Sequence, residues 1–171
     1  MGYYIKSHGN QFKIRKSNLD KFFEIVSNLM SSETMQRYAS GGSYSNGEKT
    51  NYWYSWVDSK AVEEAINNRD IFAFFEAWRY EISHNGFEEF ENFICTNLNP
   101  RDGEQKIGDE ELLFAAIAPV VENGSFIEII GEDNAQWKWS WKGKKFFVAD
   151  AKSVTYGTPR EHTLDSGTRA Y

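Results

Sequence analysis

The fold is decided by residues 124–150, which have the sequence GSFIEIIGEDNAQWKWSWKGKKFFVAD. The part at 126–130 is rich in β-branched and aromatic residues, which favour strands. Residues 131–134 (GEDN) and 142–144 (KGK) supply Gly, Asp and Asn, which tolerate the backbone angles of a tight reversal. The stretch therefore predicts three consecutive strands in an antiparallel meander, with the third strand at residues 145–149.

The middle strand carries three tryptophans, Trp137, Trp139 and Trp141, which alternate with polar residues. Side chains in a strand alternate between two faces, so all three indoles share one face. Three neighbouring exposed indoles would form a large apolar patch, so they must be covered. We favour packing beneath the protein's own helices, because large aromatic side chains dominate cores. The alternative is a stacking platform for bases or another ring-shaped ligand.

Helix patterns occur in four other parts of the chain. Apolar residues recur three and four apart in residues 19–30 and 109–121, which predicts two amphipathic helices. Asp109 is expected to cap the second of these helices. Asp58 or Ser59 is expected to cap a short helix that ends near residue 66, and Asp70 a second helix that ends near residue 79.

Further strands are expected at residues 2–7, 11–15, 51–57 and 80–95. A turn at residues 8–10 would separate the first two, and the last is a hairpin with a turn at residues 84–86. Residues 31–50 show no clean periodicity and predict a long loop. Since the strands and helices lack a regular β-α-β spacing, the pattern predicts an α+β fold. We expect a mostly antiparallel sheet of five to seven strands with three to four helices packed on one face.

The chain has 171 residues, which suits one domain. We expect a single α+β domain over residues 1–155 and a polar C-terminal tail over residues 156–171. The single cysteine, Cys95, excludes an intramolecular disulfide framework. The sequence shows neither an apolar run of about 20 residues nor a secretory leader pattern, so we expect no membrane association and a cytoplasmic location.

The formal net charge is −6 at neutral pH. Duplex binding requires Lys and Arg to neutralise phosphates, so this charge disfavours nucleic acid as a partner. An acidic protein suits a partner with a basic surface instead.

Motifs for catalysis and metal binding are incomplete. Residues 42–50 (GSYSNGEKT) resemble a phosphate-binding P-loop, but Glu48 breaks the spacing and the strand–loop–helix context is missing. The three histidines are scattered and match no zinc site. Cys95, at the end of a predicted strand, fits a buried small hydrophobe better than a nucleophile.

Acidic pairs have a structural explanation. Glu132 and Asp133, like the acidic residues at 109–111, could supply paired carboxylates for acid–base or metal chemistry. Turns and helix caps favour the same residues outright, and we prefer that interpretation. The sequence therefore predicts a protein that is not an enzyme and holds no metal or cofactor.

Seven short motifs remain: GYY at residues 2–4, AWRY at 77–80, KIGDE at 106–110, AIAP at 116–119, GSFIE at 124–128, GED at 131–133 and WKW at 137–139. Together they resemble a group of small proteins that phages and mobile elements carry. The likeness is greatest over residues 76–80 and 106–141. No secure activity is known for that group, so no catalytic residue carries over. The resemblance implies a context, because phage accessory proteins of this size often bind and disable host proteins, including defence systems.

The first functional hypothesis is therefore an accessory protein that binds and inhibits a host protein, in an anti-defence, anti-CRISPR-like role. Its richness in aromatic residues fits an interface. The expected contact regions are residues 40–56 and 131–134, the expected partner is a host protein with a basic surface, and the expected location is the host cytoplasm. A homodimer is left open.

Two alternatives use the same aromatic residues. One is a protein that binds and sequesters a nucleotide signal by stacking it on Trp53, on Trp78 with Arg79, or on the tryptophan stripe. The other is a module for single-stranded nucleic acid, which would add the lysines at 138–145 and bind in a salt-dependent way. Across these hypotheses the candidate binding residues are Tyr44, Tyr52, Trp53, Trp56, Trp78, Arg79, Glu132, Asp133, Trp137 and Trp139.

Overall fold

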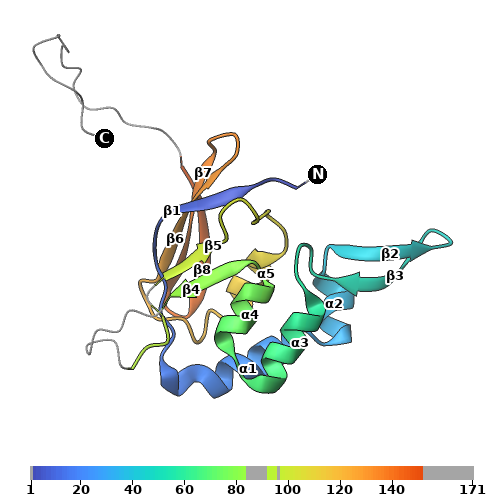
Figure 1. The fold of residues 1–171 in the computed structure, drawn as a ribbon, viewed down its shortest axis with the longest axis horizontal. Helices are drawn as coiled ribbons and strands as arrows, with labels where there is room; N and C mark the ends of the chain where they lie inside the picture. The colour runs from blue at the N-terminus through green and yellow to red at the C-terminus, as the bar shows by residue number, and fades with distance from the viewer. Residues whose placement is uncertain (1, 84–91, 96, 152–171) are drawn as a thin grey trace, which may run out of the picture.

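The computed structural model describes residues 2–83, 92–95 and 97–151. Over these residues the chain forms five α-helices and eight β-strands (Figure 1). The fold is α+β, as predicted. The expected single sheet of five to seven strands is wrong, because the strands divide into one four-stranded sheet and two two-stranded sheets. The predicted tail at residues 156–171 lies outside the described residues.

The main sheet contains β1 (Ile5–Gln11), β6 (Phe126–Gly131), β7 (Gln136–Lys142) and β8 (Lys145–Asp150). Its spatial order is β1-β6-β7-β8, and every neighbouring pair is antiparallel. The predicted meander is therefore confirmed. Its second turn is tight: Gly143 and Lys144 have φ values of 58° and 62°, which suit a two-residue hairpin turn.

Strand β1 differs from its predicted form. The turn expected at residues 8–10 is instead part of one strand, which pairs with β6 from Ile5 to Gln11. A bulge between Ser7 and Gly9 shifts the register. A bulge accommodates an extra residue without ending a strand, which explains why the His-Gly-Asn sequence does not reverse the chain.

The five helices are α1 (Leu19–Leu29), α2 (Ser32–Tyr38), α3 (Ser59–Asn68), α4 (Ile71–Ala77) and α5 (Glu110–Ala116). The caps predicted at Asp58 and Asp70 are confirmed, since each side chain accepts a backbone N–H three residues later. Asp109 occupies the N-cap position of α5 as predicted, but its side chain makes no capping bond and is bonded elsewhere. No helix of the described segments is long and apolar enough to cross a membrane.

The indole face of β7 is part of the core. Trp139 and Trp141 are buried, and their ring centroids lie 5.1 Å and 5.4 Å from that of Phe114 in α5. The Trp139 indole N–H donates to Glu111 Oε1 at 2.8 Å, and the Trp141 indole N–H donates to the Phe114 carbonyl oxygen at 3.1 Å. Core packing of the stripe is therefore confirmed for these two residues.

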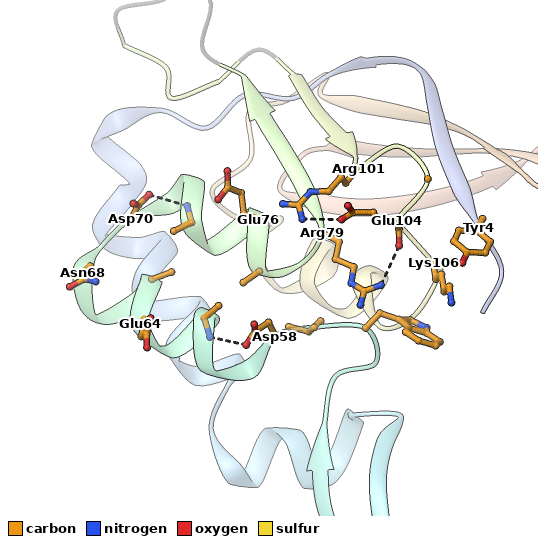
Figure 2. A pocket seen from close by; sticks show the side chains of 17 residues that line it. Tyr4, Asp58, Glu64, Asn68, Asp70, Glu76, Arg79, Arg101, Glu104 and Lys106 are labelled. Carbon is orange, nitrogen blue, oxygen red and sulfur yellow. Dashed lines mark hydrogen bonds and ion pairs between the residues drawn. The ribbon is translucent and has the colours of Figure 1, made fainter. Parts of the chain in front are cut away.

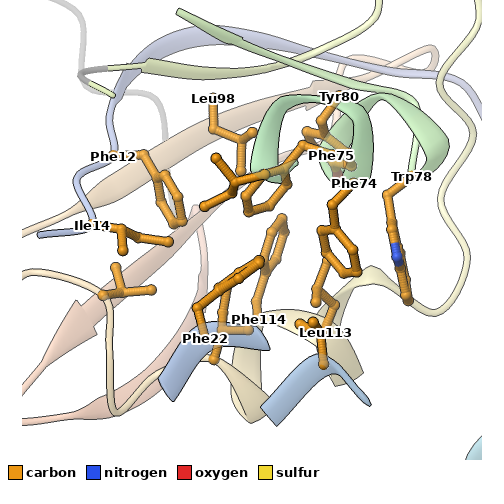
Figure 3. Packing of buried hydrophobic residues seen from close by; sticks show 14 of the residues in the cluster. Phe12, Ile14, Phe22, Phe74, Phe75, Trp78, Tyr80, Leu98, Leu113 and Phe114 are labelled. Carbon is orange, nitrogen blue, oxygen red and sulfur yellow. The ribbon is translucent and has the colours of Figure 1, made fainter. Parts of the chain in front are cut away.

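Aromatic residues of three helices complete this core (Figure 3). Phe22 of α1, Phe74 and Phe75 of α4, and Phe114 of α5 are all fully buried. The rings of Phe22 and Phe74 meet edge to face with their centroids 5.2 Å apart, which is a favoured geometry for aromatic pairs. Phe12, just beyond β1, contacts both Phe75 and Trp141, so helices and main sheet share one core.

Strands β2 (Gly41–Ser45) and β3 (Glu48–Trp53) form an antiparallel hairpin. This hairpin, together with α2, replaces the loop predicted for residues 31–50. Figure 1 shows it extending away from the main sheet beside α2. The turn at its tip uses Asn46 and Gly47, which have φ values of 52° and 81°.

Strands β4 (Tyr80–Ser83) and β5 (Asn97–Pro100) form the second small sheet. The hairpin predicted within residues 80–95 has its turn at 84–86 and most of its second arm outside the described residues, so its pairing stays a prediction. The described part of its second arm lies against another segment, because Phe93 forms a β-bridge with Arg15.

Candidate functional site

Two of the predicted binding residues, Trp78 and Trp139, belong to the core. Both side chains are buried, and the Trp78 ring packs 5.4 Å from that of Tyr54. A side chain with almost no exposed surface cannot contact a partner, so these two assignments are corrected. Trp137 is only partly buried and lies beside Tyr3, with 6.4 Å between ring centroids.

Glu132 and Asp133 lie in the exposed turn between β6 and β7. Asp133 is engaged locally, since it accepts hydrogen bonds from the Tyr3 hydroxyl and from the Ala135 N–H. The bond from Tyr3 lowers the pKa of the Asp133 carboxyl below its ordinary value. These contacts explain Asp133 as a residue that fixes the turn.

The β2–β3 hairpin carries three more candidates, Tyr44, Tyr52 and Trp53. Neither strand contains a buried residue. Tyr44 is 70% exposed and Trp53 is 40% exposed. Tyr52 is partly buried and lies against Lys49, whose Nζ is 5.1 Å from the ring centroid. The hairpin thus presents two aromatic side chains to solvent on strands that have no core of their own.

The base of the hairpin is held by Asp109, which is buried at the start of α5. Its Oδ2 accepts the Ser40 N–H at 3.1 Å, the Ser40 hydroxyl at 2.9 Å and the Ser55 N–H at 2.8 Å. Lys49 Nζ adds bonds to the carbonyl oxygens of Ala39 at 2.8 Å and Ser40 at 3.1 Å. One carboxylate therefore attaches both ends of the hairpin to the body of the protein.

An open groove of about 830 Å³ lies between helices α3 and α4 on one side and residues 101–106 on the other (Figure 2). The helices contribute four acidic side chains to its wall: Asp58, Glu64, Asp70 and Glu76. Cationic and aromatic side chains line the opposite end: Tyr4, Trp56, Arg79, Arg101 and Lys106. The groove is therefore acidic along the two helices and carries three cationic side chains at the other end, where Glu104 also lines it and pairs with Arg101.

Four residues at the basic end form what we call the basic–aromatic site: Tyr4, Trp56, Arg79 and Lys106. Lys106 Nζ lies 4.6 Å from the Trp56 ring centroid and 4.8 Å from that of Tyr4. The guanidinium carbon of Arg79 lies 5.7 Å from the Trp56 centroid. These distances allow cation–π attraction, so the two rings hold both cations in place.

The positive charges of Arg79 and Lys106 are not neutralised by neighbouring carboxylates. Arg101 pairs with Glu104, with 3.1 Å between Nη1 and Oε2. Arg79 donates to the Glu104 backbone carbonyl at 3.2 Å. Neither Arg79 nor Lys106 forms an ion pair with any carboxylate in the part of the chain that the structure describes.

The backbone of the site is strained at two residues. Trp56 has a φ of 65° and Arg79 a φ of 63°, left-handed values that bulky residues rarely adopt. Gly108 makes room for the Trp56 ring, because a Cβ there would lie 2.8 Å from the Ser55 carbonyl oxygen and 3.0 Å from Trp56 Cδ1. Left-handed residues also end α3, at Arg69, and occur in hairpin turns; Arg79 directly follows the cap of α4, whereas Trp56 lies at no helix end.

The described residues hold no cluster of three or more His, Cys, Asp or Glu side chains that could bind a metal ion. Burial raises the pKa of the Cys95 thiol to about 12, and its Sγ donates to the Phe12 carbonyl oxygen at 3.0 Å. This thiol stays protonated at neutral pH. The basic–aromatic site instead offers positive charge, N–H donors and ring faces, which are groups for binding.

Sequence reasoning found Trp56 and Arg79 of this site but missed Tyr4 and Lys106. The four residues come from distant parts of the chain, and no local spacing connects them. Tyr4 and Lys106 do fall in the GYY and KIGDE motifs, which is the one signal for them in the sequence.

Comparisons with protein-family models, with curated proteins and with solved structures find no match to this chain. The resemblance to proteins of phages and mobile elements therefore stays a prediction.

Proposed function

We propose that this chain acts by binding another protein through the β2–β3 hairpin, and that the partner is a host defence protein which it inhibits. One observation carries the proposal. The hairpin extends from the body with Tyr44 and Trp53 exposed, while a buried carboxylate, that of Asp109, holds its base.

The β2–β3 hairpin contains no buried residue, so contacts other than core packing must stabilise it. Isolated two-stranded hairpins are at best marginally stable in water. Here Asp109 and Lys49 supply five hydrogen bonds at the base, and burying the Asp109 carboxylate for this purpose is itself unfavourable. The result is a rigidly attached arm whose side chains are left available for contact.

The side chains of this arm suit a protein interface. Tyr and Trp are enriched at interfaces because they supply large, rigid contact area at a low loss of conformational entropy. The outer edges of β2 and β3 pair with no other described strand, so each can also accept a strand from a partner.

The nature of the partner follows from charge and context. The hairpin strands themselves carry one acidic and one basic residue, Glu48 and Lys49. Attraction over distance must therefore come from the chain as a whole, whose net charge of −6 favours a partner with a basic surface. The resemblance to phage proteins supports a host defence protein as that partner.

A pull-down from host lysate with matched variants tests this proposal. We expect the natural chain and a Phe72→Ser control, which loses an exposed aromatic residue on α4, to capture the same protein in stoichiometric amount. A Tyr44→Ser/Trp53→Ser variant should lose it. A photo-crosslinking side chain at position 44 should label that protein, while the same group at position 72 should not. Capture that survives the double substitution would refute the role of the hairpin.

A further inference from the structure

The basic–aromatic site has the features of a site for an anion. Arg79 and Lys106 lie in different segments of the chain, and both side chains contact the Trp56 ring. No described carboxylate forms an ion pair with either of them. Like charges that approach each other repel, and ring faces compensate them only weakly. A phosphate between the guanidinium and the ammonium group would relieve this repulsion and would accept charge-assisted hydrogen bonds from both.

The strained backbone supports a role for these particular side chains. Gly or Asn would adopt the left-handed φ values of residues 56 and 79 at little strain. The chain has instead a Trp and an Arg, which are the two side chains that face each other across the site. At Arg79 the left-handed conformation also ends α4, so the argument from strain rests on Trp56, which lies at no helix end.

The rest of the groove is suited to a planar ring with polar groups. Tyr4 and Trp56 are 42% and 37% exposed, so each leaves side-chain surface beside the cations that a heterocycle can contact. The volume of about 830 Å³ lies within the usual range for small-molecule sites. The acidic wall, which includes Asp58 and Glu76, repels a phosphate and accepts hydrogen bonds from amino and hydroxyl groups.

From this geometry we infer that the groove binds a nucleoside phosphate. Its phosphate lies between Arg79 and Lys106, its base stacks on Trp56 or Tyr4, and its amino or hydroxyl groups face the acidic wall. This function is separate from the hairpin interface, since Tyr44 and Trp53 do not line the groove.

Isothermal titration calorimetry with a graded set of compounds tests the inference. The set contains nucleoside mono- and diphosphates of the common bases, the parent nucleosides, ribose 5-phosphate and inorganic phosphate. We expect at least one nucleoside phosphate to bind, and its nucleoside and ribose 5-phosphate to bind about tenfold or more weakly. Each part of the ligand would then contribute through a contact of its own.

Variants then locate the site. Arg79→Gln and Lys106→Gln should each weaken binding about tenfold or more, because each removes a charged hydrogen-bond donor. Lys142→Gln, which makes the same charge change at an exposed residue outside the groove, should leave affinity unchanged. Circular dichroism and thermal unfolding establish that each variant is folded. In an NMR spectrum the indole N–H signal assigned through Trp56→Phe should shift on titration.

Four results would overturn the inference. They are no binding by any compound at millimolar concentration, equal binding of ribose 5-phosphate and the nucleoside phosphate, affinity unchanged in both Gln variants, and much tighter binding of a short single-stranded oligonucleotide. The last result would assign the groove to nucleic acid. The Tyr44→Ser/Trp53→Ser variant should bind the nucleotide normally, so failure of the hairpin proposal and failure of this inference can be told apart.

Discussion

Arg79 adopts a left-handed backbone (φ 63°), and this conformation makes a testable contribution to stability. Such a conformation costs an ordinary residue about 1–2 kcal/mol, but Gly adopts it freely. We therefore expect Arg79→Gly to be more stable than Arg79→Ala by about 1 kcal/mol, although both lose the same side-chain contacts. Urea unfolding of the two variants measures the difference.

Arg101 provides the control for this comparison. It is a neighbouring arginine of the same groove without a positive φ. There, Gly should be less stable than Ala, because Gly has more conformational freedom to lose on folding. If the Gly variant is less stable than the Ala variant at both positions, the left-handed backbone at Arg79 carries no measurable strain.

Glu110 makes the stability of the protein depend on pH. Its carboxylate is buried; Oε2 accepts the Gly108 N–H at 2.6 Å, and Oε1 has no hydrogen-bond partner among the described residues. Burial raises its pKa from 4.5 to about 7. The folded chain therefore binds the proton more tightly than the unfolded chain, and stability falls as pH rises from about 4.5 to about 7.

Substitution of Glu110 by Gln should remove this pH dependence. The pKa difference between 4.5 and about 7 corresponds to about 3 kcal/mol. Glu110→Gln should thus be more stable than the natural chain at pH 8 by up to this amount, and the advantage should vanish near pH 4.5. Urea unfolding at four pH values measures it. A stability difference between Glu110→Gln and the natural chain that stays constant with pH would contradict the assignment.

The sequence predicts the environment of some single residues but not of others. The tryptophan stripe could be assigned to the core because its period of two and its size leave few alternatives. The apolar pattern of residues 71–79 predicts a well-buried helix that includes Trp78, but the same sequence also allows Trp78 to stack a ligand together with Arg79; the structure buries Trp78 and leaves Arg79 partly exposed. Asp109 was expected at a helix cap, and only the folded chain brings Ser40 and Ser55 to it.

The β2–β3 hairpin depends on its attachment at Asp109. Asp109→Ala removes the acceptor of three hydrogen bonds, so we expect a loss of about 2 kcal/mol and a hairpin that opens independently of the core. Limited chymotrypsin digestion should then cut at Tyr44, Tyr52 or Trp53, while the signals of the buried tryptophans stay unchanged. Mass spectrometry of the fragments identifies the cleavage sites.

Asp70→Ala is the matched comparison for that element. Asp70 caps α4 by accepting the Ala73 N–H, so its removal should cost about 1 kcal/mol. Because this cap has no contact with the hairpin, the chymotrypsin pattern should not change. Equal cleavage of the hairpin in both variants would show general loosening rather than loss of the attachment at Asp109.

The elements that could be predicted are those with strong local patterns. The meander of β6, β7 and β8 follows from alternation and turn residues, and α3 and α4 follow from their caps. The β2–β3 hairpin was missed because Gly and Ser dominate β2, whose strand character comes from pairing with β3. Strand β5 ends in Pro100, and its pairing with β4 depends on the tertiary fold.

Among the described strands, one edge of the main sheet carries exposed apolar residues. Strand β8 is the last strand of the main sheet, and Phe147 and Val148 are 47% and 46% exposed. Exposed apolar edge strands promote pairing between molecules. We expect weak self-association, which Val148→Lys should reduce and Phe72→Lys, on a helix, should not. Sedimentation velocity over a range of concentrations tests this, and a natural chain that stays monomeric at high concentration would contradict it.

The groove also depends on the packing of the whole molecule. Its basic–aromatic site joins residues 4, 56, 79 and 106, which lie on four separate segments. Local pattern predicts elements, but the meeting of four segments depends on how those elements pack, so the site could only be recognised in the folded chain.

The β2–β3 hairpin is attached at its base and contains no fully buried residue, so its amide protons and those of the main sheet should exchange at different rates. Amide protons of β6 and β7 exchange with solvent only when the common core unfolds, whereas those of β2 and β3 need only a local opening. Hydrogen-exchange mass spectrometry should therefore show a fast class in residues 41–53 and a slow class in the main sheet. A bound partner would slow the fast class alone, so exchange kinetics can report occupancy of the hairpin before the partner is known.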